Sequence, residues 1–136
     1  MSTSSPACAA DLYDGAYGLT LRLFIPSDQH LDAFIKSLQA ISGAEFVEQT
    51  LENEGHFILT GVGSVRLNLH NGEAKEKTVF LDRKHKPPCI EWGGNKAQWS
   101  LRAATLTGFE SGKPAHHYLS TERIDDVLIE VSYLGG

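Results

Sequence analysis

Residues 27–43, SDQHLDAFIKSLQAISG, place apolar side chains wherever a helix of 3.6 residues per turn returns to the same side. These positions are Leu31, Phe34, Ile35, Leu38 and Ile41. Ser27 or Asp28 is a suitable N-cap, and Gly43 suits the position just past the helix end. The pattern predicts an amphipathic helix over about 28–42, with its apolar face packed on a sheet.

Most of the remaining chain has the composition and period of β-strands. Residues 17–25, YGLTLRLFI, alternate apolar and polar side chains up to Pro26, which predicts a strand with one apolar face. Further strands are expected in the runs 44–49, 56–60, 64–70, 78–82, 89–92 and 98–106. Gly61-Val62-Gly63 predicts a hairpin between the second and third of these runs. The β-branched residues of the C-terminal segment favour a strand over a helix there.

These elements predict one α+β domain spanning residues 1–136. We expect a mostly antiparallel β-sheet with hairpins and the single early helix on one face. A chain of 136 residues has the common size of one domain and is long enough to bury a substantial core. Residues 1–11 are small and polar, and we expect a flexible arm.

The charge balance makes nucleic-acid binding an improbable function for this chain. It has 12 Lys and Arg against 17 Asp and Glu, a net charge of −5, whereas phosphate neutralisation needs clustered cations. A protein partner with a basic surface fits better. The N-terminus lacks the pattern of a secretory signal, and no apolar run is long enough to span a membrane. We therefore expect a cytoplasmic protein with no membrane partner; its oligomeric state is not determined by these patterns.

The segment RKHKPPCIEWGG, residues 83–94, combines basic residues with Cys89, Glu91 and Trp92. A nucleophilic cysteine needs a nearby base, but Pro87-Pro88 predicts an extended link to His85. That link would hold the two side chains on the order of 12 Å apart. The segment is therefore interpreted as a loop leading into a strand, and no catalytic residue is assigned.

The six histidines show no close spacing of the kind that zinc sites use, so no metal and no cofactor are predicted. One alternative remains open: a small metal-dependent or hydrolytic enzyme whose histidines cluster only after folding. That enzyme hypothesis requires at least two of His56, His70, His85, His116 and His117 to meet in one pocket.

The C-terminus, LIEVSYLGG, resembles the tails of ubiquitin-like and sulfur-carrier proteins. The resemblance covers Leu134, Gly135, Gly136 and the preceding strand. It implies a projecting Gly-Gly tail that an activating enzyme adenylates, which is a second alternative function.

The function class that remains, and that we expect, is a small cytoplasmic protein-binding module. Its narrower form is an acidic inhibitor or immunity-type protein that neutralises a partner with a basic active site. Trp92, beside two glycines, and Tyr118 are expected at the contact surface, whereas Trp99 is expected in the core. The acidic contact patch is expected from Glu45, Glu48, Glu52 and Glu54, or from Asp125, Asp126 and Glu130.

Overall fold

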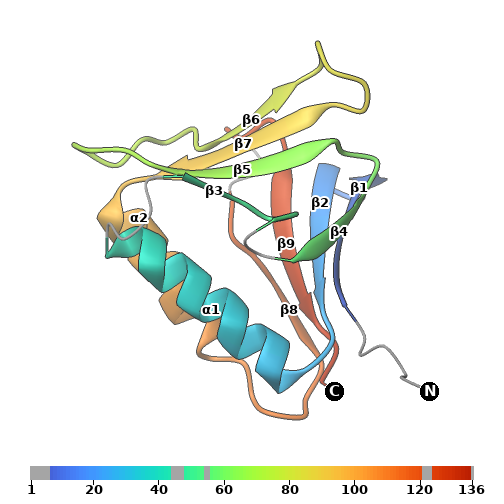
Figure 1. The fold of residues 1–136 in the computed structure, drawn as a ribbon, viewed down its shortest axis with the longest axis vertical. Coiled ribbons are helices and arrows are strands. Elements are labelled where there is room, and N and C mark those ends of the chain that lie inside the picture. The colour runs from blue at the N-terminus through green and yellow to red at the C-terminus, as the bar shows by residue number, and fades with distance from the viewer. Residues whose placement is uncertain (1–6, 44–47, 54–55, 121–123, 136) are drawn as a thin grey trace.

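The computed structural model describes residues 7–43, 48–53, 56–120 and 124–135, which form two helices and nine strands in two sheets (Figure 1). In the five-stranded sheet the order is β4 (Phe57–Thr60), β1 (Cys8–Gly15), β2 (Gly18–Ile25), β9 (Leu128–Tyr133) and β8 (Ala115–Tyr118). In the four-stranded sheet it is β3 (Glu48–Thr50), β5 (Ser64–Leu69), β7 (Cys89–Gly94) and β6 (Val79–Asp82). The expected single-domain α+β fold is confirmed.

Both sheets are mixed. Adjacent strands pair antiparallel in β1–β2, β3–β5, β6–β7 and β8–β9, and parallel in β1–β4, β2–β9 and β5–β7. Parallel pairing is thus more extensive than the sequence suggests. Strand β9 is the last element of the chain, yet it lies inside the five-stranded sheet between β2 and β8. The C-terminal strand is confirmed.

Helix α1 (Asp28–Ser42) matches its predicted bounds. The Ser27 side chain caps it by accepting a hydrogen bond from the His30 backbone N–H, and Gly43 follows its last residue. The five apolar residues of the predicted stripe are all buried. Figure 1 shows α1 and α2 (Lys96–Leu106) side by side in the angle between the two sheets, where they cover the inner face of each.

The prediction of a strand over 98–106 is wrong, because this segment lies in α2. Asn95 and Gln98 form a capping box, in which each side chain bonds the other residue's backbone N–H. Trp99, Ala103 and Leu106 lie on one helical face and are buried, while Leu101 is exposed. The alternation that indicated a strand is short, and the same residues also satisfy the helical spacing.

The hairpin predicted at Gly61-Val62-Gly63 is also wrong. Both flanking strands exist, but β4 pairs with β1 in one sheet and β5 pairs with β3 and β7 in the other. The tripeptide carries the chain from one sheet to the other. Val62 is buried in the core at this crossing, and Gly61 has a φ of 78°, which favours glycine.

The prediction of a flexible arm over residues 1–11 is wrong for residues 8–11. Cys8 to Asp11 belong to β1, which forms a hairpin with β2 and contributes Cys8 and Ala10 to the core. Residues 1–6 lie outside the described residues. Among the described residues, no helix has the length and apolar character needed to cross a membrane.

Candidate functional site

The five-stranded sheet has one face in the core and one face that neither helix covers (Figure 1). Strand alternation sends Leu21, Leu23 and Ile25 inward and leaves Arg22 and Phe24 on the other side. We call this other side the open face. It was not identified from the sequence, although the polar side of the predicted strand 17–25 pointed to it.

An ion pair lies at the centre of the open face. Arg22 on β2 is directly opposite Glu130 on β9, and its Nε donates to Glu130 Oε1 at 2.6 Å. The Arg22 Nη2 also donates to the Tyr13 hydroxyl, and the guanidinium carbon lies 4.5 Å from the centre of the Tyr13 ring. His116 Nδ1 lies 3.6 Å from the second Glu130 oxygen. Glu130 is only 6% exposed although it lies on an uncovered face, because these side chains surround it.

The charge of Glu130 shifts the pKa values of its neighbours. The hydrogen bond with Glu130 raises the pKa of Arg22 above its usual range. Burial, together with the Glu130 charge, raises the pKa of the Tyr118 hydroxyl. Both side chains therefore keep their protons at neutral pH, so Arg22 stays a cation and Tyr118 a neutral phenol.

Large exposed side chains surround this ion pair. Tyr17 in the β1–β2 turn is 65% exposed and meets Tyr118 edge to face, with ring centres 6.3 Å apart. Ile58 on β4 is 62% exposed and pairs with Ala9 of β1 on the same face. A hollow of about 400 Å³ adjoins the ion pair and is lined by Arg22, Glu130 and neighbouring residues of β8 and β9. The open face thus combines rigid aromatic groups with a fixed ion pair.

Of the two aromatic residues predicted at a contact surface, the structure exposes only one. Tyr118 is on the open face, whereas Trp92 is fully buried, so its predicted exposure is wrong. Trp92 packs against Trp99 with ring centres 5.0 Å apart and ring planes tilted by 56°, because the inward side of β7 faces α2. Trp99 is in the core as predicted.

Among the described residues, the carboxylates predicted for an acidic patch have partners within the domain. Glu48 lies 3.4 Å from Arg66, and Glu52 accepts hydrogen bonds from Ser64 Oγ and the Val65 N–H. Asp125 accepts from the Thr78 and Val79 N–H groups, and Asp126 pairs with Lys77. Glu130 is on β9 of the five-stranded sheet, whereas Val79 is on β6 of the four-stranded sheet. Glu45 and Glu54 lie outside the described residues. These carboxylates mainly hold neighbouring segments together.

The histidines do not form a metal site among the described residues. No group of three or more His, Cys, Asp or Glu side chains is placed to hold an ion. His116 and His117 follow each other on β8, so they point to opposite faces of the sheet.

Cys89 and His85 line the same hollow beside the loop between β6 and β7. Asp82 and Cys89 are direct partners in the β6–β7 ladder, and the Lys86–Pro87 peptide bond is cis. Cys89, His85 and Asp82 line one hollow of about 300 Å³, with His85 Nε2 3.7 Å from Asp82 Oδ2. Within the described residues, no hydrogen bond joins His85 to Cys89.

Cys89 is expected to react with iodoacetamide in the folded protein, whereas Cys8 is expected to stay unmodified. Cys89 is partly exposed, while Cys8 is 4% exposed and burial raises its pKa to about 11. At about pH 8, on the order of one thousandth of Cys8 is thiolate, the form that reacts. Peptide mapping by mass spectrometry measures both sites, and Cys8 should become reactive in urea. Equal native rates at the two cysteines would contradict the packing of β1.

The C-terminal tail is held against the domain as far as the structure describes it. The Leu134 N–H donates to the Ile25 carbonyl, and the Gly135 backbone lies beside Pro114. The projecting tail that the carrier hypothesis requires is therefore not present at Leu134 and Gly135. Gly136 lies outside the described residues.

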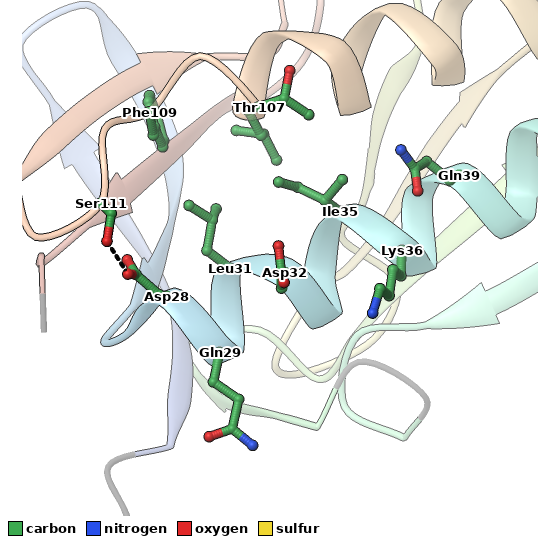
Figure 2. Close-up of a pocket in the computed structure, with 11 residues that line it drawn as sticks. Asp28, Gln29, Leu31, Asp32, Ile35, Lys36, Gln39, Thr107, Phe109 and Ser111 are labelled. Atoms are coloured by element: carbon green, nitrogen blue, oxygen red, sulfur yellow. Dashed lines mark hydrogen bonds between the residues drawn. The ribbon is translucent and has the colours of Figure 1, made fainter.

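A groove of about 650 Å³ runs between α1 and the segment that leaves α2 (Figure 2). Asp28 on one side accepts a hydrogen bond from Ser111 on the other, and also one from the Tyr133 hydroxyl. The groove floor is apolar and includes Leu31 and Ile35. These bonds tie the start of α1 to the loop after α2.

Comparison with known proteins identified no relative of this chain. Neither a scan against protein-family models nor searches of curated proteins and solved structures found a match. Any function proposed for this chain must therefore rest on its own geometry.

Proposed function

We propose that this chain is a protein-binding domain that contacts a basic protein partner through its open face. The observation that carries the proposal is the arrangement there: Arg22 bonds both Glu130 and Tyr13, and the exposed Tyr17 and Tyr118 lie on the same face. Tyrosine and arginine are enriched among residues that dominate binding energy, because they bury a large area at low entropic cost.

The charge of the open face supports a basic partner. Asp11 lies opposite Arg22 in the β1–β2 ladder, so Arg22 has two acidic neighbours, Asp11 and Glu130. The whole chain carries a net charge of −5. Such a balance attracts a cationic surface and accelerates its association at low salt.

The narrower form of the proposal is an inhibitor of the immunity type, in which the bound surface is a basic active site. The open face is compatible with this form, since exposed aromatic side chains with two carboxylates beside Arg22 are suited to covering a cationic cleft. It differs from the general proposal in one measurable respect, which is that binding abolishes the partner's activity.

The test compares three purified proteins as baits for a lysate of the source organism. They are the native chain, the double variant Tyr17→Ser/Tyr118→Ser, and the control Phe80→Ser, which removes an exposed aromatic residue from the four-stranded sheet. We expect one stoichiometric partner for the native chain and the control. Its Kd should rise about tenfold or more in the double variant, and capture should weaken at high salt.

Two results would contradict this proposal. In one, the double variant captures the partner as well as the native chain does; in the other, the Phe80→Ser control alone loses it. If capture succeeds, an activity assay of the identified partner with and without the native chain decides between the inhibitor and a non-inhibitory binding module.

A further inference from the structure

A third hollow, of about 370 Å³, lies between α2 and the segment from β8 to β9. Its lining comes from segments distant in sequence and includes the polar residues Glu76, Gln98, Arg102, Tyr118 and Asp125. This volume is within the range of small-molecule sites in proteins. It is separate from the centre of the open face, although Tyr118 borders both.

Arg102 is a buried cation without a close counter-ion among the described residues. It is 7% exposed, and its Nη1 donates to the Gly93 carbonyl at 2.8 Å. None of the ion pairs formed by the described residues includes Arg102. A guanidinium has five N–H donors, and no second hydrogen bond from this one to the described residues is formed. The side chain lines the hollow, where a ligand can use the remaining donors.

Burying this charge carries an energetic cost. Desolvation lowers the pKa of Arg102 to about 10, although Asp125 acts against the shift, so the side chain stays charged at neutral pH. A buried cation is unfavourable unless an anion pairs with it, and an apolar side chain of similar size is often at least as stable. The position of Arg102 is therefore better explained by a ligand than by stability.

Neighbouring groups hold the guanidinium in one orientation. Its central carbon lies 4.4 Å from the centre of the Trp99 ring and 5.2 Å from that of Trp92. Trp99 is itself fixed by a hydrogen bond from its Nε1 to the Asn68 carbonyl. Gly94 leaves the necessary space, because a Cβ there would lie 2.6 Å from Arg102 Nη1. A planar donor group held in this way is preorganised for a planar acceptor.

We infer that this hollow binds a small molecule through a single carboxylate, which the Arg102 guanidinium receives. Planar carboxylates match the guanidinium fork, and the rest of the ligand would contact Leu101, Leu119 and Tyr118. Glu76 and Asp125 also line the hollow and repel added negative charge, so a monoanion is favoured over a phosphate dianion. Tyr118 is shared with the protein contact proposed for the open face, but Arg102, which receives the carboxylate, is not part of that contact.

Tryptophan fluorescence reports directly on this site, because the chain has two tryptophans and both lie against Arg102. The native protein is titrated at constant ionic strength with benzoate, with its neutral analogue benzamide, and with inorganic phosphate. We expect a saturable change with benzoate, no saturable change with benzamide, and weaker binding of phosphate than of benzoate.

Two variants test this site independently of each other. Arg102→Met removes the charge and should weaken benzoate binding about tenfold or more. Glu76→Gln alters an exposed residue of the lining and should strengthen benzoate binding roughly twofold to threefold. Arg66→Met, an exposed arginine of β5 remote from the hollow, is the matched control and should leave the benzoate Kd unchanged.

The inference is overturned by any of three results. They are equal responses to benzoate and benzamide, tighter binding of phosphate than of benzoate, and an unchanged benzoate Kd in folded Arg102→Met. If Arg102→Met does not fold, Glu76→Gln decides: a tighter benzoate Kd supports the site and an unchanged one rejects it.

Discussion

Replacing Trp92 by alanine is expected to lower the free energy of unfolding by about 3–5 kcal/mol. Trp92 is fully buried and packs against Trp99 and Arg102 at the junction of β7 and α2, so its removal leaves a large cavity. Domains of this kind have total stabilities of about 5–15 kcal/mol, so the variant should unfold at a much lower urea concentration. Urea denaturation followed by far-UV circular dichroism measures the change.

Two further variants separate packing from a role at the surface. Trp92→Phe should cost much less than the alanine change, since it keeps an aromatic ring and removes an indole N–H that has no partner among the described residues. Leu101→Ala, on the exposed side of α2, should change stability by less than about 0.5 kcal/mol. A Trp92→Ala protein of native stability that no longer captures its partner would instead restore the original expectation that Trp92 is a contact residue.

Replacing Asp125 by alanine is expected to cost about 2–4 kcal/mol. Its Oδ1 accepts hydrogen bonds from the Thr78 N–H at 2.7 Å and the Val79 N–H at 2.9 Å, and both residues are buried. The alanine variant leaves two buried donors unpaired at the start of β6, and each such donor costs about 1–3 kcal/mol. Chemical denaturation measures this loss.

Asp125→Asn is the matched control, because the amide oxygen can still accept from both N–H groups. It should recover most of the lost stability. Asp126→Ala, the neighbouring change, removes a partly exposed pair with Lys77 and an exposed hydrogen bond from the Leu81 N–H. Because neither is buried, it should cost about 1 kcal/mol or less. Equal losses in Asp125→Ala and Asp126→Ala would show that Asp125 does not act through these two backbone bonds.

Local sequence patterns were sufficient to predict an element when only one of its faces packs against the core. Helix α1 was predicted with its bounds because five apolar residues repeat at helical spacing between Ser27 and Gly43. Strand β2 was predicted because inward and outward residues alternate over its length. Each pattern concerns near neighbours, so it can be read without knowing the partner element.

The same reasoning failed where distant contacts decide between two local solutions. Residues 98–106 fit both a short alternation and a helical face, and in the helix Trp99 packs against Trp92 of β7. The segment Gly61-Val62-Gly63 resembles a hairpin turn, but β4 finds its partner in β1 and not in β5. Trp92 follows a polar loop, yet the side of β7 that carries it faces α2.

The candidate sites were less predictable than the fold. Tyr118 was identified as a surface aromatic residue, but Arg22 and Tyr13 gain significance only when β9 brings Glu130 beside them across 108 positions of the chain. The acidic residues expected in a patch instead bind backbone N–H groups and basic side chains nearby. No pattern of charge in the sequence distinguishes a carboxylate that binds a partner from one that holds a loop.

By itself, the sequence determined the α+β class, the position of α1 and most of the strands, because hydrophobic periodicity depends on backbone geometry alone. The tertiary structure decided how the strands divide between two sheets, which aromatic residues are buried, and which charges meet. Those outcomes depend on pairing between segments far apart in the chain, where many arrangements satisfy the same local pattern and only packing of the whole core selects one.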